Sequence, residues 1–117
     1  NDNIMIAAMI EQPDGVARAG DIAGVPGVDA IFVASSDLGS FSGKRQGDPE
    51  YEALVTKIHD DTLSAGKILG GPSAWRDRDD FLFFQGPGTT SLIRSGARAA
   101  LETESNVAEI EGTAPRR

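Results

Sequence analysis

Short runs of apolar residues alternate along the chain with segments whose apolar residues are spaced three or four positions apart. The runs are rich in Val, Ile and Phe, which is typical of β-strands packed inside a protein. The first run is unbroken until Glu11, and this pattern predicts a strand that is buried on both faces. The predicted strands cover residues 4–10, 28–33, 68–70 and 81–84.

The clearest helix follows Asp48 and Pro49, which suit the N-cap and the first position of a helix. Apolar residues then recur at spacings of three and four, and Gly66 ends the pattern. The other predicted segments are a weak helix or two short ones over 13–25, a Gly- and Ser-rich loop over 35–47, a short charged helix or turn over 75–80, a last helix over 89–102 and a flexible tail over 103–117.

Successive strand–helix units predict an α/β fold with a parallel sheet, in which reactive groups gather where the strands end. Glu11 follows the first strand, and Asp37 comes shortly after the second. Adjacent parallel strands are about 4.8 Å apart, so both carboxylates can reach one point between them. This arrangement suits a hard divalent cation such as Mg²⁺ or Mn²⁺. In the alternative interpretation, Glu11 binds no metal, and its negative charge only interacts favourably with the dipole at the start of the following helix.

The composition is that of an ordinary globular protein, with 39% hydrophobic and 25% charged residues. The formal net charge of -7 argues against nucleic acid or an anionic membrane as a partner, because both require clustered Lys and Arg. No apolar run approaches the roughly 20 residues of a transmembrane helix, and the chain has no cysteine. We therefore expect a cytoplasmic protein without disulfide bonds.

Residues 9–38, MIEQPDGVARAGDIAGVPGVDAIFVASSDL, resemble the core of the HpcH/HpaI aldolase/citrate lyase family, the class II pyruvate aldolases. The shared pattern is an apolar strand ending in Ile-Glu, a Gly-Val helix, and VPGVDA ahead of an Asp-Leu pair. The resemblance covers about residues 4–102 and implies the C-terminal half, strands five to eight, of a TIM barrel. We accordingly expect a half-barrel of βα units over residues 1–102, followed by the tail over 103–117.

The resemblance implies a lyase that cleaves a 4-hydroxy-2-oxo acid to pyruvate and an aldehyde. In this family Mg²⁺, Mn²⁺ or another divalent ion stabilises the pyruvate enolate, and Glu11 and Asp37 match the metal-ligand positions. The pyruvate carboxylate is expected to bind backbone N–H groups of Ser36 and Asp37. Met9 and Ser35 occupy two further substrate positions, at which many members of the family carry Gln and Pro.

The catalytic Arg and the general base of the family belong to the N-terminal half of the barrel, so the base stays unknown here. We expect a fragment with weak activity or none by itself, or else two half-barrels that assemble. A citrate-lyase-like enzyme for CoA thioesters and a non-catalytic assembly module are the alternative functions. The resemblance also implies a homo-oligomer in which the last helices of neighbouring barrels pack together. Their apolar stripe would be Leu92, Ile93, Ala97, Ala100 and Leu101.

Four other features allow both a functional and a structural interpretation. Lys44 and Arg45, in the predicted loop after Asp37, are candidates to bind a distal carboxylate of the substrate, or are solvated charges. The Gly-Pro stretches at 70–72 and 86–88 either shape an anion pocket or form plain turns. We expect His59 at the surface rather than as a base, and Trp75 as a packing residue rather than a residue of the site.

Overall fold

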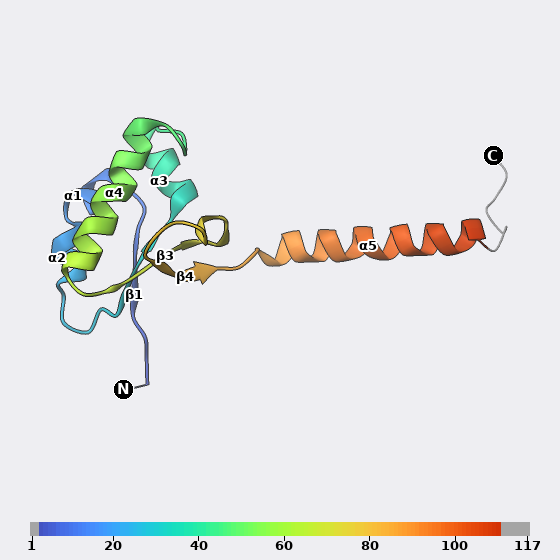
Figure 1. Ribbon diagram of the computed structural model, residues 1–117, viewed down its shortest axis with the longest axis horizontal. Helices are drawn as coiled ribbons and strands as arrows, with labels where there is room; N and C mark the ends of the chain where they lie inside the picture. Colours follow the sequence, from blue (N-terminus) through green and yellow to red (C-terminus); the bar gives the residue numbers. More distant parts are fainter. Residues whose placement is uncertain (1–2, 111–117) are drawn as a thin grey trace. The chain divides into compact units, whose positions relative to one another are not determined.

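The computed structural model describes the backbone of residues 3–110 and the side chains of residues 3–102. The chain divides into two compact units, residues 1–86 and residues 87–117. The first unit contains four strands with the helices between them, and the second contains the helix α5, Thr89–Ile110 (Figure 1). The candidate site lies in the first unit.

The four strands form one parallel sheet in the order β1-β2-β3-β4. Ile10 pairs with Val33 in the register of β1 and β2, so these two strands end side by side. Parallel neighbours require a crossover connection, and the intervening helices provide it. The predicted α/β fold with a parallel sheet is therefore confirmed. The strands are β1 Ala7–Ile10, β2 Ala30–Val33, β3 Ile68–Pro72 and β4 Phe81–Gln85.

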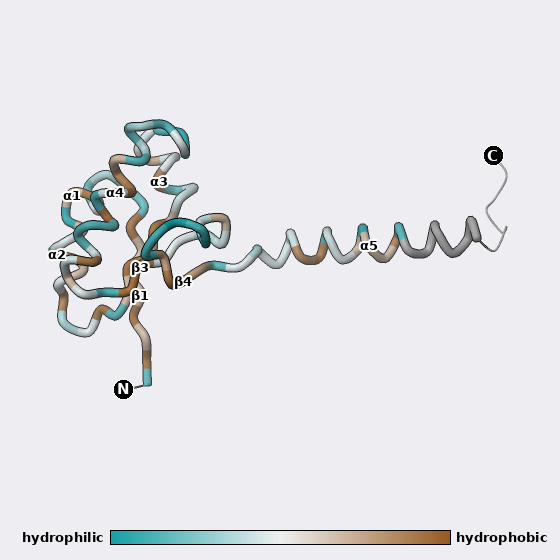
Figure 2. Tube along the Cα trace, in the orientation of Figure 1, coloured by the Kyte–Doolittle hydropathy of each residue, from teal (hydrophilic) through white to brown (hydrophobic). Residues whose placement is uncertain are grey.

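Three helices pack together beside the sheet, namely α1 Pro13–Ala17, α2 Ala19–Ala23 and α4 Pro49–Ser64 (Figure 1). Hydrophobic residues concentrate along the strands next to them (Figure 2). α4 begins at Pro49 as predicted, and its end is marked by Gly66, whose φ of 67° suits glycine. The buried core between helices and sheet includes Ile31, Val33, Leu69, Tyr51 and Ile58.

The first strand is shorter and less buried than the sequence predicts. It begins at Ala7, and Ile10 is its only buried residue, whereas Met9 is 57% exposed. Ile10 belongs to the core and Ala8 packs against it, whereas Ala7 and Met9, which alternate with them along the strand, are exposed. The prediction of burial on both faces is therefore wrong for β1, whereas all residues of β2 are buried.

The predicted loop over 35–47 is wrong in its first part, because Ser35–Ser42 form the helix α3. Glycine and serine have low helix propensity, so the local sequence does not favour this helix. Leu38 is completely buried in the core and anchors it there. Gly43 ends α3 in the left-handed conformation, with a φ of 67°.

The last helix, predicted to end near Glu102, continues to Ile110. Residues 103–110 contain neither Gly nor Pro, so no residue of this segment favours an end of the helix. Residues 111–117 lie outside the described part of the chain, and the division into a half-barrel over 1–102 and a tail over 103–117 stays a prediction. Among the described helices, none combines the length and apolar character needed to cross a membrane.

Candidate functional site

A cavity of about 190 Å³ lies at the carboxyl edge of the sheet. Every strand contributes to it near its end, through Met9 of β1, Phe32 of β2, Pro72 of β3 and Gln85 of β4. Ligands of open parallel α/β sheets bind at this edge. The other lining residues join β2 to the first turn of α3, and they are Val33, Ala34, Ser35, Ser36 and Asp37.

The first turn of α3 supplies hydrogen-bond donors beside this cavity. Only Ala34 separates the last residue of β2 from the first residue of α3. The backbone hydrogen bond from Leu38 N–H to the Ala34 carbonyl, 2.8 Å long, starts the helical ladder. The N–H groups of Ser36 and Asp37 therefore have no acceptor within the helix. Free N–H groups at a helix start bind anions, including carboxylates.

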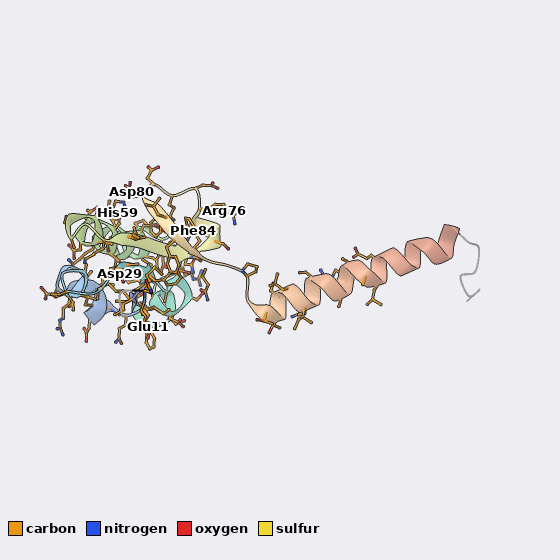
Figure 3. All side chains as sticks on the ribbon, turned by 90° about the horizontal axis from the view of Figure 1, so that it is seen from below. Glu11, Asp29, His59, Arg76, Asp80 and Phe84 are labelled. Atoms are coloured by element: carbon orange, nitrogen blue, oxygen red, sulfur yellow. The ribbon has the colours of Figure 1, made fainter. Side chains whose placement is uncertain are left out.

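Two carboxylates belong to this edge of the sheet. Glu11 directly follows β1 and is half-buried, while Asp37 is exposed in the first turn of α3 (Figure 3 labels Glu11). Neither forms an ion pair with another described residue. Among the described side chains, those of residues 3–102, no group of three or more His, Cys, Asp or Glu could hold a metal ion. Two carboxylates fit a cation such as Mg²⁺, which keeps water and substrate oxygens as its other ligands.

An apolar wall of the cavity comes from Phe32. Its ring meets that of Phe83 edge-on, with the ring centroids 6.1 Å apart. Both rings close over Gly70, where an added Cβ would lie 2.7 Å from the Phe83 carbonyl oxygen and 2.8 Å from its Cδ1 atom. The close approach of the two rings thus requires glycine at position 70.

The structure brings four of the predicted site residues to one cavity, namely Met9, Ser35, Ser36 and Asp37. Glu11 lies two residues after Met9 in the chain but is not among the lining residues. Lys44 and Arg45 lie in the exposed loop after α3 and do not line the cavity either. The chemical roles assigned to all of these residues stay predictions.

Gln85 is a lining residue that the sequence analysis missed. It follows the apolar run 81–84 as Glu11 follows the first run, so the rule that singled out Glu11 could have found it. Pro72 belongs to one of the two Gly-Pro stretches considered above, and it lines the cavity because β3 continues past Gly70.

Trp75 and His59 do not belong to the cavity lining. Trp75 is buried and packs edge-on against Tyr51 and Phe81, which confirms its predicted packing role. His59 is partly exposed and hydrogen-bonded to two carboxylates, those of Asp60 and Asp80. Figure 3 shows His59 and Asp80 close together.

The sequence profile of the HpcH/HpaI aldolase/citrate lyase family matches residues 1–80, more than half of the chain. The chain belongs to this family. The hydroxypyruvate/pyruvate aldolase of Sagittula stellata is 34% identical to it over 102 residues, which make up 87% of this chain and 36% of that protein. The hydroxypyruvate/pyruvate aldolase of Delftia acidovorans is 37% identical over 73 residues, or 60% of this chain and 27% of that protein. The chain thus spans roughly a quarter to a third of the length of these two relatives in the HpcH/HpaI family.

A solved member of the family has the same fold. The HpcH/HpaI aldolase/citrate lyase family protein from Burkholderia cenocepacia J2315 superimposes with a TM-score of 0.74 at 24% identity. The superposition covers 89% of this chain and 44% of that one. The prediction of a TIM-barrel-type α/β fold is confirmed, and the four parallel strands correspond to part of a barrel of this HpcH/HpaI family.

Proposed function

We propose that this chain belongs to a metal-dependent aldolase that cleaves a 4-hydroxy-2-oxo acid to pyruvate and an aldehyde. Family membership supports an enzyme of the aldolase or lyase type. The observation that carries the finer proposal is the cavity at the carboxyl edge, where Asp37 and the free N–H groups at the start of α3 occur together. A 2-oxo acid presents a carboxylate beside a keto group, and this pair of groups needs an anion-binding site beside a Lewis acid.

In the proposed reaction each part of the site has a separate task. The N–H groups of Ser36 and Asp37 donate hydrogen bonds to the substrate carboxylate. The side chains of Glu11 and Asp37 hold a divalent cation, which supplies Lewis-acid polarisation of the keto group when bound. Met9 and Phe32, which line the cavity, give the carbon chain of the substrate an apolar wall.

The proton transfers of the aldol cleavage require a further group. The cavity lining contains no His, Lys or Arg side chain among the described residues. A placed acid or base typically contributes about 10²–10⁴-fold to the rate. We therefore expect residues 1–117 alone to bind metal weakly and to turn over little or no substrate, and we expect aldolase activity from the full-length protein.

The test is the cleavage of 4-hydroxy-2-oxo acids by the full-length protein, before and after removal of metal by a chelator. Activity should disappear on chelation and return when Mg²⁺ or Mn²⁺ is added. Asp37→Asn should lower kcat/KM by at least about 10²-fold, since loss of even an outer partner of a metal ligand commonly costs 10–100-fold. His59→Gln is the matched control and should retain activity, because His59 lies outside the cavity lining.

Two results would contradict the proposal. Full activity in the presence of the chelator would remove the metal-dependent mechanism, and equal losses in the two variants would remove the assigned role of Asp37. Turnover of a CoA thioester in place of the hydroxy-oxo acid would favour the citrate-lyase-like alternative.

A further inference from the structure

The hydroxyl group of Tyr51 reaches from α4 to the start of α3. It donates a hydrogen bond of 2.9 Å to the backbone carbonyl of Ser35, and the Tyr51 side chain is fully buried. Sixteen residues separate the two partners in the sequence. This contact is therefore tertiary, and it joins the core directly to the residue that precedes Ser36 and Asp37.

The ring of Tyr51 also lies along the body of α3. A Cβ atom built on Gly39 would be 3.8 Å from the Tyr51 Cε2 atom, at ordinary contact distance. Gly39 lies one helical turn after Ser35, so the Tyr51 ring lies near α3 at the turn that follows the hydrogen bond. The hydrogen bond holds the peptide group that contains the Ser35 carbonyl and the Ser36 N–H.

Tyr51 is itself held in place by a second set of side-chain contacts. Its ring meets the buried Trp75 edge-on, with the centroids 6.5 Å apart. The guanidinium carbon of Arg78 stands 4.2 Å from the centroid of the Trp75 ring, as in a cation–π contact. Arg78 in turn forms two hydrogen bonds to Glu52, of 2.7 and 3.1 Å. The position of the Tyr51 hydroxyl is thus set by a packed chain of side chains.

We propose that Tyr51 is a positioning residue, which orients the N–H groups of Ser36 and Asp37 toward the carboxylate of a 2-oxo acid. This inference rests on the function proposed above and deepens it. Tyr51 does not line the cavity and acts only through the Ser35 carbonyl. A tilt of that peptide group would change the direction of the next two N–H bonds, because Ser35, Ser36 and Asp37 are consecutive.

Tyr51 can act as a donor over the whole neutral range. Burial, together with the nearby charge of Glu52, raises the pKa of Tyr51 to about 12, although Arg78 acts in the opposite direction. The phenol therefore stays protonated, and its bond to Ser35 does not switch with pH near neutrality.

Tyr51→Phe in the full-length protein removes this hydroxyl and retains the ring. Thr62→Val is the matched control, because Thr62 is also a fully buried hydroxyl of α4 and donates a 2.6 Å bond to Ile58, away from the cavity lining. Amide hydrogen exchange at Leu38, whose N–H group bonds to the Ala34 carbonyl, reports on the order of the first turn of α3. Calorimetric titration of pyruvate in the presence of Mn²⁺, together with steady-state kinetics, reports on substrate binding.

In Tyr51→Phe we expect faster exchange at the Leu38 amide, and a Kd for pyruvate and a KM for substrate raised about three- to tenfold. That range corresponds to one net hydrogen bond of roughly 0.5–1.5 kcal/mol. A carboxylate held in both the ground state and the transition state affects KM more than kcat, so kcat should change by less than about twofold. Thr62→Val should leave all of these quantities at wild-type values.

Unchanged exchange at the Leu38 amide in Tyr51→Phe would overturn the inference, and so would altered exchange with unchanged pyruvate affinity. Equal effects of Thr62→Val would also overturn it, since they would indicate a general loss of stability. A wild-type protein that neither binds nor produces pyruvate would instead overturn the proposed function, and with it the assigned substrate role of Tyr51. The exchange data would then still decide whether Tyr51 orients α3.

Discussion

The first turn of α4 and its later turns both contact the connection between β3 and β4, residues 73–80, but they do so with different chemistry. Near the start of the helix, Glu52 forms a two-bond ion pair with Arg78. Two turns later, His59 is bonded to Asp80 at 3.2 Å and to Asp60 at 2.8 Å. The first contact adjoins Tyr51 and hence α3, whereas the second adjoins neither.

The two contacts differ in the pH range over which they stay charged. The hydrogen bonds from Arg78 lower the pKa of Glu52, and the same bonds raise the pKa of Arg78, so this pair remains ionised at neutral pH. Hydrogen bonds to Asp60 and Asp80 raise the pKa of His59 from 6.5, against the opposing effect of burial. The contact next to the candidate site is therefore insensitive to pH near neutrality, and the distant one is sensitive.

The largest expected effect comes from breaking the packing behind the first contact. Trp75→Ala should lower the free energy of unfolding by about 3–5 kcal/mol, because it removes a buried ring that contacts Tyr51, Phe81 and Arg78. Urea unfolding followed by circular dichroism measures this loss. Phe41→Ala is the matched control, since Phe41 is 60% exposed, and a surface substitution should stay within about 0.5 kcal/mol. Similar losses in both variants would show that Trp75 does not anchor this region.

A smaller effect is expected when the first contact keeps its charge but loses its geometry. Arg78→Lys cannot make two parallel bonds to Glu52 or present a planar cation to Trp75. Since both side chains of the pair are about a third exposed, the loss should be about 1 kcal/mol or less.

Arg76→Lys is the control for this substitution, because the side chain of Arg76 donates only to the Ser73 carbonyl and is exposed. The contribution of Glu52 should be present above its ordinary pKa of 4.5 and be lost as the pH falls through its lower folded-state pKa. In Arg78→Lys, the free energy of unfolding should therefore fall less steeply below pH 4.5 than it does in the wild type. If Arg76→Lys changed this pH dependence as much as Arg78→Lys does, the account would be contradicted.

The smallest expected effect concerns the second contact. Because the folded-state pKa of His59 lies above 6.5, protonation favours the folded protein. The stabilisation from His59 should be complete below pH 6.5 and should disappear as the pH rises through the raised pKa. His59→Gln should remove this dependence, as measured by thermal unfolding between pH 5.5 and about 9. If Arg78→Lys removed it and His59→Gln did not, the contrast between the two contacts would be wrong.

The order of strands and helices could be predicted because the apolar runs and the helical spacing are local patterns. The spacing that begins after Pro49 gives the start and the buried face of α4. α3 could not be predicted in this way, since the helix contains Gly39 and four serines, a composition that is typical of a loop. That helix exists because Leu38 is buried and Tyr51 bonds to Ser35, and both contacts involve residues distant in the sequence.

The candidate site, like the fold, could be predicted from the sequence only in part. Sequence position placed Asp37 and Ser36 after the second strand, and the structure adds that they begin a helix. Gln85 was missed because it is uncharged and the resemblance attached no role to it. Tyr51 is one of the regularly spaced residues that follow Pro49, and no periodic pattern distinguishes a buried hydroxyl that bonds to another helix.

The single residue between β2 and α3 has a consequence for how such an enzyme can diversify. Because Ala34 alone connects the strand to the helix, an insertion at this junction would displace the N–H groups of Ser36 and Asp37. The exposed segment 43–48, which carries Lys44 and Arg45, follows the same helix and lines no part of the cavity. Under the function proposed above, changes in length or charge within segment 43–48 would leave the N–H groups of Ser36 and Asp37 in place. We therefore expect sequence changes to be tolerated better at the far end of α3 than where the helix begins.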